Sequence, residues 1–86
     1  MELNILIENI KSKLLNSPFV EDVVIEDKTY LHLKHSSHEK NKFHLKLTVF
    51  SNNLKILSKI DATKKIHNIL HFEIKNYIHS IQILFK

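Results

Sequence analysis

Histidines dominate the residues of this 86-residue chain that could perform chemistry. Seven are present, and four of them fall within the thirteen residues HLKHSSHEKNKFH, which run from His32 to His44. His32, His35 and His38 are spaced by three. Neutral imidazole is a common metal ligand, and its protonation also changes near neutral pH. The stretch therefore has three interpretations: a metal site, a pH switch, or a polar loop.

The other candidate histidines stand on predicted helices and strands. His67 and His71 are four apart on a predicted helix, a spacing that zinc sites use, but no Glu completes the HExxH pattern, so we interpret them as a surface pair. His79 stands where a predicted helix passes into the last predicted strand. His44 points away from the apolar face of its strand, so we expect it to be a solvated residue of the outer face.

The composition excludes several kinds of chemistry. There is no cysteine, so the chain has no disulfide, no thiolate ligand and no cysteine nucleophile, and any metal it bound alone would use His, Asp or Glu. No nucleophile–base pair, paired carboxylates or phosphate loop is visible in the sequence, so we predict that the protein is not an enzyme. No apolar run is long enough for a membrane span. No presequence is visible, which favours the cytoplasm, with the mitochondrion as the alternative if a presequence was removed.

The charge is distributed unevenly along the chain. Residues 1–27 hold six acids and two lysines, a charge of −4, whereas residues 28–86 hold eleven lysines and three acids, a charge of +8. A basic half is typical of proteins that bind nucleic acid or an acidic partner. The alternative is a compositional bias, since all thirteen basic residues are lysine and glycine is absent.

Hydrophobic periodicity predicts a helix followed by two strands in the first part of the chain. Apolar residues at spacings of three and four predict an amphipathic first helix: Leu3, Leu6, Ile7, Ile10 and Leu14. Pro18 ends it, because proline cannot continue a helix. A β-branched run over residues 20–26 predicts the first strand, and strict alternation over residues 43–50 predicts the second.

The rest of the chain predicts helices and a last strand. Ser51 to Asn53 read as a turn and residues 56–60 as a short helical turn, with a cap at Ser58. Periodicity over residues 66–77 predicts a second long helix, and alternation over residues 79–85 predicts the last strand.

These elements predict one domain over residues 1–86, of the α/β (α+β) class with the order α-β-β-α-α-β. The first two strands should be antiparallel, and the helical crossover should place the last strand parallel to the second. Both long helices should then cover one face of a three-stranded mixed sheet.

This order and several short strings resemble the BolA-like family over nearly the whole chain. The family pattern Val-x-Val-x-Asp-x-Ser matches residues 23–29, VVIEDKT, and the pattern His-Phe-x-Val matches residues 44–47, HLKL, with Phe50-Ser51 at the end of that strand. Leu-x-x-Glu matches residues 70–73, LHFE, and Val-His-Ala-Leu matches residues 78–81, IHSI. The spacing from Ser51 to His79 also fits the family.

Two departures concern partner contacts. The family's Phe-x-Gly turn after the second strand has no glycine here, and its Arg-His-Arg segment aligns with Ala62-Thr63-Lys64, which keeps one positive charge. Lys64 is therefore the candidate partner-binding residue of that segment.

The resemblance implies a fold similar to class II KH modules and a function without catalysis. Such proteins are monomers that pair with CGFS-type monothiol glutaredoxins and share a bridging [2Fe–2S] cluster, in cluster assembly and trafficking or iron regulation. The glutaredoxin and its glutathione supply thiolates. The BolA-like chain supplies the histidine before its last strand, here His79, and a residue from the loop between the first two strands.

The family's loop-ligand position can be aligned with this sequence in more than one way. Counting forward from Thr29 places it at His32, whereas counting back from His44 places it at His35, and His38 is a third alternative. The two counts differ by three, which indicates a lengthened loop.

The alternative function is that of a KH-like nucleic-acid-binding protein or transcriptional regulator that uses the lysine-rich half of the chain. KH modules clamp the nucleic-acid backbone with a GXXG loop, and this chain has no glycine. Binding of nucleic acid through lysines alone would be weak, independent of the base sequence and strongly dependent on the salt concentration.

Overall fold

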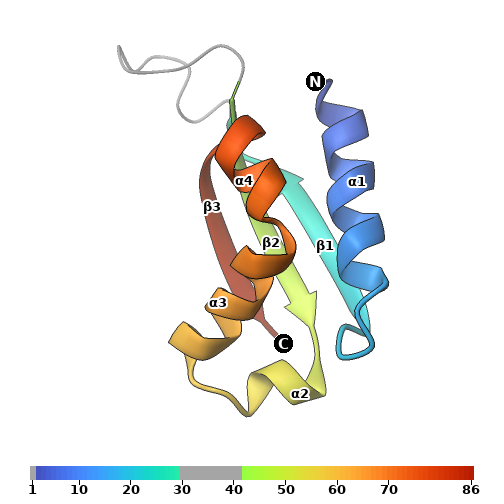
Figure 1. Ribbon diagram of the computed structural model, residues 1–86, viewed down its shortest axis with the longest axis vertical. Helices are drawn as coiled ribbons and strands as arrows, with labels where there is room; N and C mark the ends of the chain where they lie inside the picture. The colour runs from blue at the N-terminus through green and yellow to red at the C-terminus, as the bar shows by residue number, and fades with distance from the viewer. Residues whose placement is uncertain (1, 30–41) are drawn as a thin grey trace.

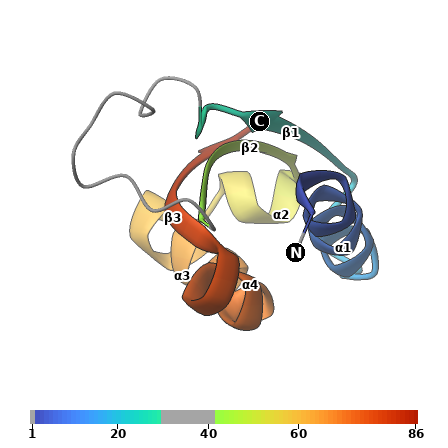
Figure 2. The same cartoon turned by 90° about the horizontal axis from the view of Figure 1, so that it is seen from above.

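Helices pack on one face of a three-stranded sheet (Figures 1 and 2). The structure, a computed structural model, describes residues 2–29 and 42–86. Its elements in chain order are α1 (Leu3–Leu15), β1 (Asp22–Asp27), β2 (Phe43–Phe50), α2 (Asn52–Lys55), α3 (Lys59–Ile69), α4 (His71–Tyr77) and β3 (Ile78–Phe85). The predicted order and the mixed sheet are confirmed. In the described part of the chain, no helix combines the length and apolarity needed to cross a membrane.

The sheet has β2 at its centre and β1 and β3 at its edges. β1 pairs antiparallel with β2, with Val23 opposite Val49, and β2 pairs parallel with β3, with Leu45 opposite Ile81. Both orientations were predicted from the connections. A parallel pair requires a long crossover, and the segment from α2 to α4 provides it.

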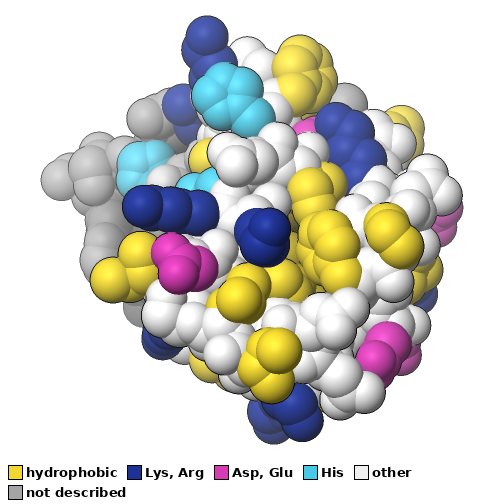
Figure 3. All heavy atoms as spheres, turned by 60° about the horizontal axis from the view of Figure 1, so that its bottom comes forward, with side chains coloured by type: hydrophobic (Ala, Val, Ile, Leu, Met, Phe, Trp, Pro, Cys, Tyr) yellow, Lys and Arg dark blue, Asp and Glu magenta, His cyan; other side chains and the backbone are white. Residues whose placement is uncertain are grey.

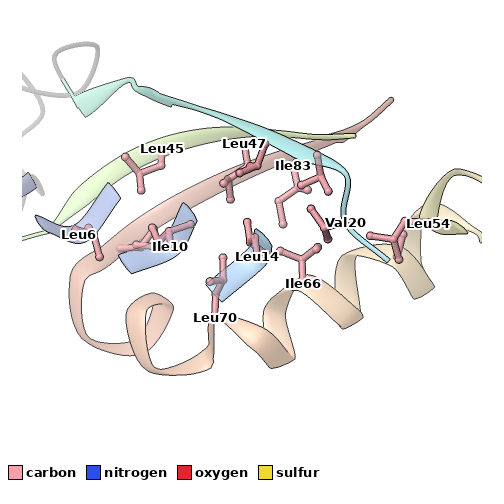
Figure 4. Close-up of a cluster of buried hydrophobic side chains, with 14 residues drawn as sticks. Leu6, Ile10, Leu14, Val20, Leu45, Leu47, Leu54, Ile66, Leu70 and Ile83 are labelled. Carbon is pink, nitrogen blue, oxygen red and sulfur yellow. The ribbon is translucent and has the colours of Figure 1, made fainter. Parts of the chain in front are cut away.

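The core lies between α1, α3 and the inner face of the sheet (Figure 4). α1 contributes Leu6, Ile10 and Leu14, whose spacing of four places them on one fully buried face. They meet Leu47 of β2 and Ile66 of α3, which are also fully buried. Each such side chain contributes about 1.5–3 kcal/mol through burial, so the predicted amphipathic patterns account for the arrangement of layers.

The crossover differs from the prediction at its start. Ser51 is the N-cap of α2, since its hydroxyl accepts a hydrogen bond from the backbone N–H of Leu54 at 3.0 Å, so the predicted turn is the first turn of a helix. The predicted helical turn over residues 56–60 is wrong, because Ile56 follows α2 and α3 begins at Lys59. The Ser58 cap is confirmed by a bond of 3.1 Å from the N–H of Asp61.

The second long helix is divided at Leu70. This residue has φ −101° and ψ 18°, and it ends α3 and precedes α4. Its N–H still bonds to Ile66 and its carbonyl still accepts from Ile74, so the bend loses little hydrogen bonding. The side chain of Leu70 is fully buried, and we attribute the bend to this packing, which periodicity alone does not reveal.

An ion pair joins α1 to α4, the first and the last helix of the layer. Glu73 of α4 is only 3% exposed, and its carboxylate oxygens lie 2.7 and 2.9 Å from Nζ of Lys13 in α1. Lys13 also lies 5.8 Å from the ring centre of Phe72. A carboxylate at such a depth is costly without a partner, so the pair holds α4 against α1.

We expect Lys13→Met to lower the free energy of unfolding by about 1–3 kcal/mol, because it leaves Glu73 without its cation. Glu73→Gln should cost a similar amount, and the double variant should cost less than the sum of the two. The control is Lys11→Met, an exposed lysine of the same helix, which should change stability little. Urea denaturation measures all four, and equal stability of the Lys13 and Lys11 variants would contradict the assigned role.

Candidate functional site

The structure brings two histidines together at one end of the sheet. His44 is the second residue of β2 and His79 is the second residue of β3. Because these strands are parallel, their beginnings meet at the same end. The imidazole ring centres of His44 and His79 lie 4.9 Å apart, with an angle of 53° between the ring planes.

A shift in strand register places His79 on this site. Phe43 lies opposite Ile78, but His44 lies opposite Ser80, so β3 has one more residue than β2 at this point. Simple alternation would place His79 on the inner face with Ile81. An extra residue of this kind re-aims the side chain beside it, which accounts for an exposed His79 next to His44.

His44 is held by polar contacts from β3 and from the two residues that directly follow β1. Its Nδ1 lies 2.6 Å from Oγ of Ser80, and its backbone N–H donates to Oγ1 of Thr29 at 3.1 Å. Its carbonyl accepts from the N–H of Lys28 at 2.7 Å. The side chain is only 5% exposed, so the prediction of a solvated His44 is wrong, although the residue does point away from the core side of β2.

The Asp-x-Thr string after β1 has a clear structural role. Both the N–H and the hydroxyl of Thr29 donate to Oδ1 of Asp27, while the same hydroxyl accepts from the N–H of His44. Thr29 is thereby fixed beside the start of β2.

The surroundings of His44 form a hollow of about 350 Å³, with Leu45 and Ile81 in its lining. Lys28 and Lys46 line it together with Ser80 and Gln82. The ammonium groups of these lysines lie 3.5 and 3.9 Å from the carboxylate of Glu26, and each side chain is about one-third exposed. The carboxylate of Asp27 joins the same network through Thr29, so two lysines and two acids surround this end of the sheet.

The predicted site residues are distributed over several places. His79 lies at the site just described, whereas His32, His35 and His38 lie outside the described residues. Lys64 is exposed on α3, and its predicted contact with a partner stays a prediction.

His67 and His71 are both exposed, and they belong to different helices, α3 and α4, because of the bend between them. Within residues 2–29 and 42–86, no three His, Asp or Glu residues are grouped as a metal site requires. The described residues thus offer a pair of imidazoles.

Sequence reasoning missed the contribution of His44. The alternation of β2 correctly gave its direction, but its burial depends on Ser80 and Thr29, which are distant in the sequence. The usable signal was the position of His44 and Ser80 inside two of the matched strings, HLKL and IHSI.

Comparison with known proteins gives one family match and a fold. The model of the BolA-like protein family matches residues 15–86. A search of curated proteins gives no match. The BolA domain of SufE1 from Arabidopsis thaliana is similar with a TM-score of 0.74 and 24% identity, covering 92% of this chain and 87% of that one. BolA1 from Arabidopsis thaliana has a TM-score of 0.72 and 20% identity, with the same coverage. The predicted likeness to KH modules stays a prediction.

We expect Ser80→Ala to lower the free energy of unfolding by about 0.5–1.5 kcal/mol, because it removes the hydrogen bond to Nδ1 of a nearly buried imidazole. The ring-nitrogen chemical shifts of His44 should change with it. Gln82→Ala is the control, since Gln82 is the next exposed residue on the same face of β3. Denaturation and nitrogen NMR provide the test, and identical results for the two variants would refute the Ser80 contact.

Proposed function

The chain belongs to the BolA-like protein family, and from that premise we propose that it is a non-enzymatic partner of a CGFS-type monothiol glutaredoxin. In this proposal the two proteins form a heterodimer and share a bridging [2Fe–2S] cluster, with thiolates from the glutaredoxin and its glutathione. The role of the pair is cluster assembly and trafficking or iron regulation.

The observation that carries the proposal is the exposure of His79 at the beginning of β3. The register shift turns this imidazole out of the core side of the strand, where alternation would have placed it beside Ile81. A ligand for a shared cluster must lie on the surface, where a second protein can approach. His79 meets that requirement, and the nearly buried ring of His44 beside it limits its movement.

The second ligand is proposed to come from the segment after Thr29. His32 is the first choice, His35 the alternative and His38 the third. Support comes from the fixed position of Thr29, which is hydrogen-bonded beside His44 and only three residues before His32. The chain therefore enters this segment at the same end of the sheet as His79.

Two lysines lie close to the proposed cluster site. A [2Fe–2S] centre with thiolate ligands is anionic, and Lys28 and Lys46 line the hollow beside His44, where their ammonium groups are available to such a centre. The chain has no cysteine, so it would supply nitrogen only. Nitrogen ligation of one iron raises the reduction potential relative to ligation by thiolates alone.

The contact between Ser80 and His44 is assigned a structural role. A serine hydroxyl against an imidazole also occurs as a nucleophile–base pair in enzymes, and the sequence had not indicated one. Here the two residues lie opposite each other in the strand register, and His44 is almost completely buried. The pairing is therefore that of neighbouring strand residues that satisfy each other's polar groups.

The test is to mix the protein with a CGFS glutaredoxin that carries its cluster and to record visible absorption and circular dichroism. The wild type should replace the spectrum of the glutaredoxin homodimer with that of a heterocomplex. His79→Ala should abolish this change. His32→Ala should abolish it as well, whereas His35→Ala should retain it if the forward count is correct.

His67→Ala is the matched control, because His67 is an exposed histidine on α3 that does not line the hollow beside His44. Far-ultraviolet circular dichroism of each variant separates loss of a ligand from loss of the fold. A wild-type protein that leaves the homodimer spectrum untouched would refute the proposed function.

A further inference from the structure

A second feature lies at the opposite end of β3, where the strand meets α2 and α3. A hollow of about 330 Å³ has an apolar floor made by Leu54, Ala62 and Ile83, all nearly buried. A neighbouring hollow of about 310 Å³ continues along β3 between Ile81 and Thr63, and both are lined by Lys59 and Ile83. We call the two together the β3 groove.

Exposed apolar side chains extend this groove. Ile56 is 84% exposed and Ile60 is 69% exposed, the highest values among the large hydrophobic residues described. Each is adjacent in sequence to residues that line the groove, Lys55 and Leu57 for the first and Lys59 for the second. Figure 3 shows hydrophobic side chains gathered on this end of the molecule with lysines beside them. Grouped exposed apolar side chains of this kind are typical of an interaction surface.

The rim of the groove is basic. Three lysines, Lys55, Lys59 and Lys86, line the larger hollow, and among the described residues no acidic one lines either hollow. None of the three forms an ion pair with another part of the described chain. An apolar floor with a lysine rim is complementary to a segment that carries both apolar and acidic side chains.

The groove follows an edge strand that lacks the usual protection against pairing. β3 has eight residues, IHSIQILF, with no charged side chain and no proline, and within residues 2–29 and 42–86 it pairs only with β2. The other edge strand, β1, carries Asp22, Glu26 and Asp27 in six residues. Proteins usually guard an edge with charges, proline or a short strand, so the uncharged β3 edge is suited to accept a further strand.

We propose that the β3 groove binds an extended segment of a partner protein in which acidic and apolar residues alternate, and that this segment adds to β3 as a fourth strand. Its apolar side chains occupy the floor over Ala62 and Ile83, and its carboxylates pair with Lys55 and Lys59. A second copy of this chain is a poorer occupant, because its β3 carries no acidic residue to pair with the lysine rim.

The groove adjoins the histidine site along β3, because Ile81 and Gln82 line both its smaller hollow and the hollow beside His44. His79 itself lines neither hollow of the groove. The proposed peptide site therefore does not require ligation by His79.

The test uses a blocked five-residue peptide of alternating Glu and Val, which matches residues 81–85 in length, titrated into isotope-labelled protein. Amide signals of residues 81–85 and 57–62 should shift in a saturable way. Hydrogen exchange at the β3 amides that face away from β2 should slow, as strand addition requires. A peptide of alternating Lys and Val should not bind, and neither should a Glu–Val peptide with N-methylated backbone amides.

The double variant Lys55→Glu/Lys59→Glu should raise the dissociation constant of the Glu–Val peptide about tenfold or more, because two attractive charge pairs become repulsive. Its matched control is Lys64→Glu/Lys65→Glu, a pair of exposed lysines on α3 that do not line the groove. His79→Ala should leave peptide binding unchanged, and the Lys55/Lys59 variant should leave the cluster spectrum of the heterocomplex unchanged.

Absence of saturable shifts at millimolar peptide would overturn the proposal. So would equal weakening by the two double variants, or unchanged hydrogen exchange along β3. Sedimentation measures self-association, and a dimer through β3 in the absence of peptide would show that a second copy is the occupant instead.

Discussion

The parallel pairing of β2 with β3 is the constraint on which the rest of the structure depends. Parallel neighbours cannot be joined by a tight turn, so a long crossover must return the chain to the end of the sheet where β2 began. α2, α3 and α4 form this crossover on one face of the sheet. The same pairing aligns the beginnings of the two strands. His44 and His79 therefore meet although thirty-five positions separate them, and the extra residue in β3 turns His79 towards the outer site.

Polar anchors hold both ends of this crossover. At its start, the fully buried hydroxyl of Ser51 donates to the carbonyl of Phe19 and accepts from the N–H of Leu54, which ties the end of β2 to the connection after α1. Near its finish, Glu73 binds Lys13 on α1. Buried polar groups are satisfied only in one arrangement, whereas apolar contacts tolerate several, so these two anchors specify how the crossover sits on α1.

The sequence predicted what depends on local pattern. Spacings of four in α1 and alternation in β2 identified the core faces, because burial of one face imposes those periods on neighbouring residues. The bend at Leu70, the depth of Glu73 and the burial of His44 were missed, since each depends on residues distant in the chain. His79 was found through the family resemblance, and the reason for its exposure, a register shift, has no signature in the periodicity of β3. The loop histidines lie outside the described residues, so the choice among them still rests on aligning the loop with the family pattern from its two flanking strands.

The two ends of β3 differ in chemistry for a common reason. In the part of the chain that the structure describes, β3 pairs only with β2 and helices cover one face of the sheet (Figure 2), so polar and apolar surface stays available along β3. At its start the register shift exposes an imidazole beside Lys28, Lys46 and a buried histidine. At its finish the gap between α2, α3 and the strand exposes apolar side chains under lysines. The two surfaces adjoin along the strand, because Ile81 and Gln82 line both the hollow beside His44 and the smaller hollow of the β3 groove. The fold thus provides two neighbouring surfaces on one small chain, one with an exposed imidazole and one suited to strand pairing.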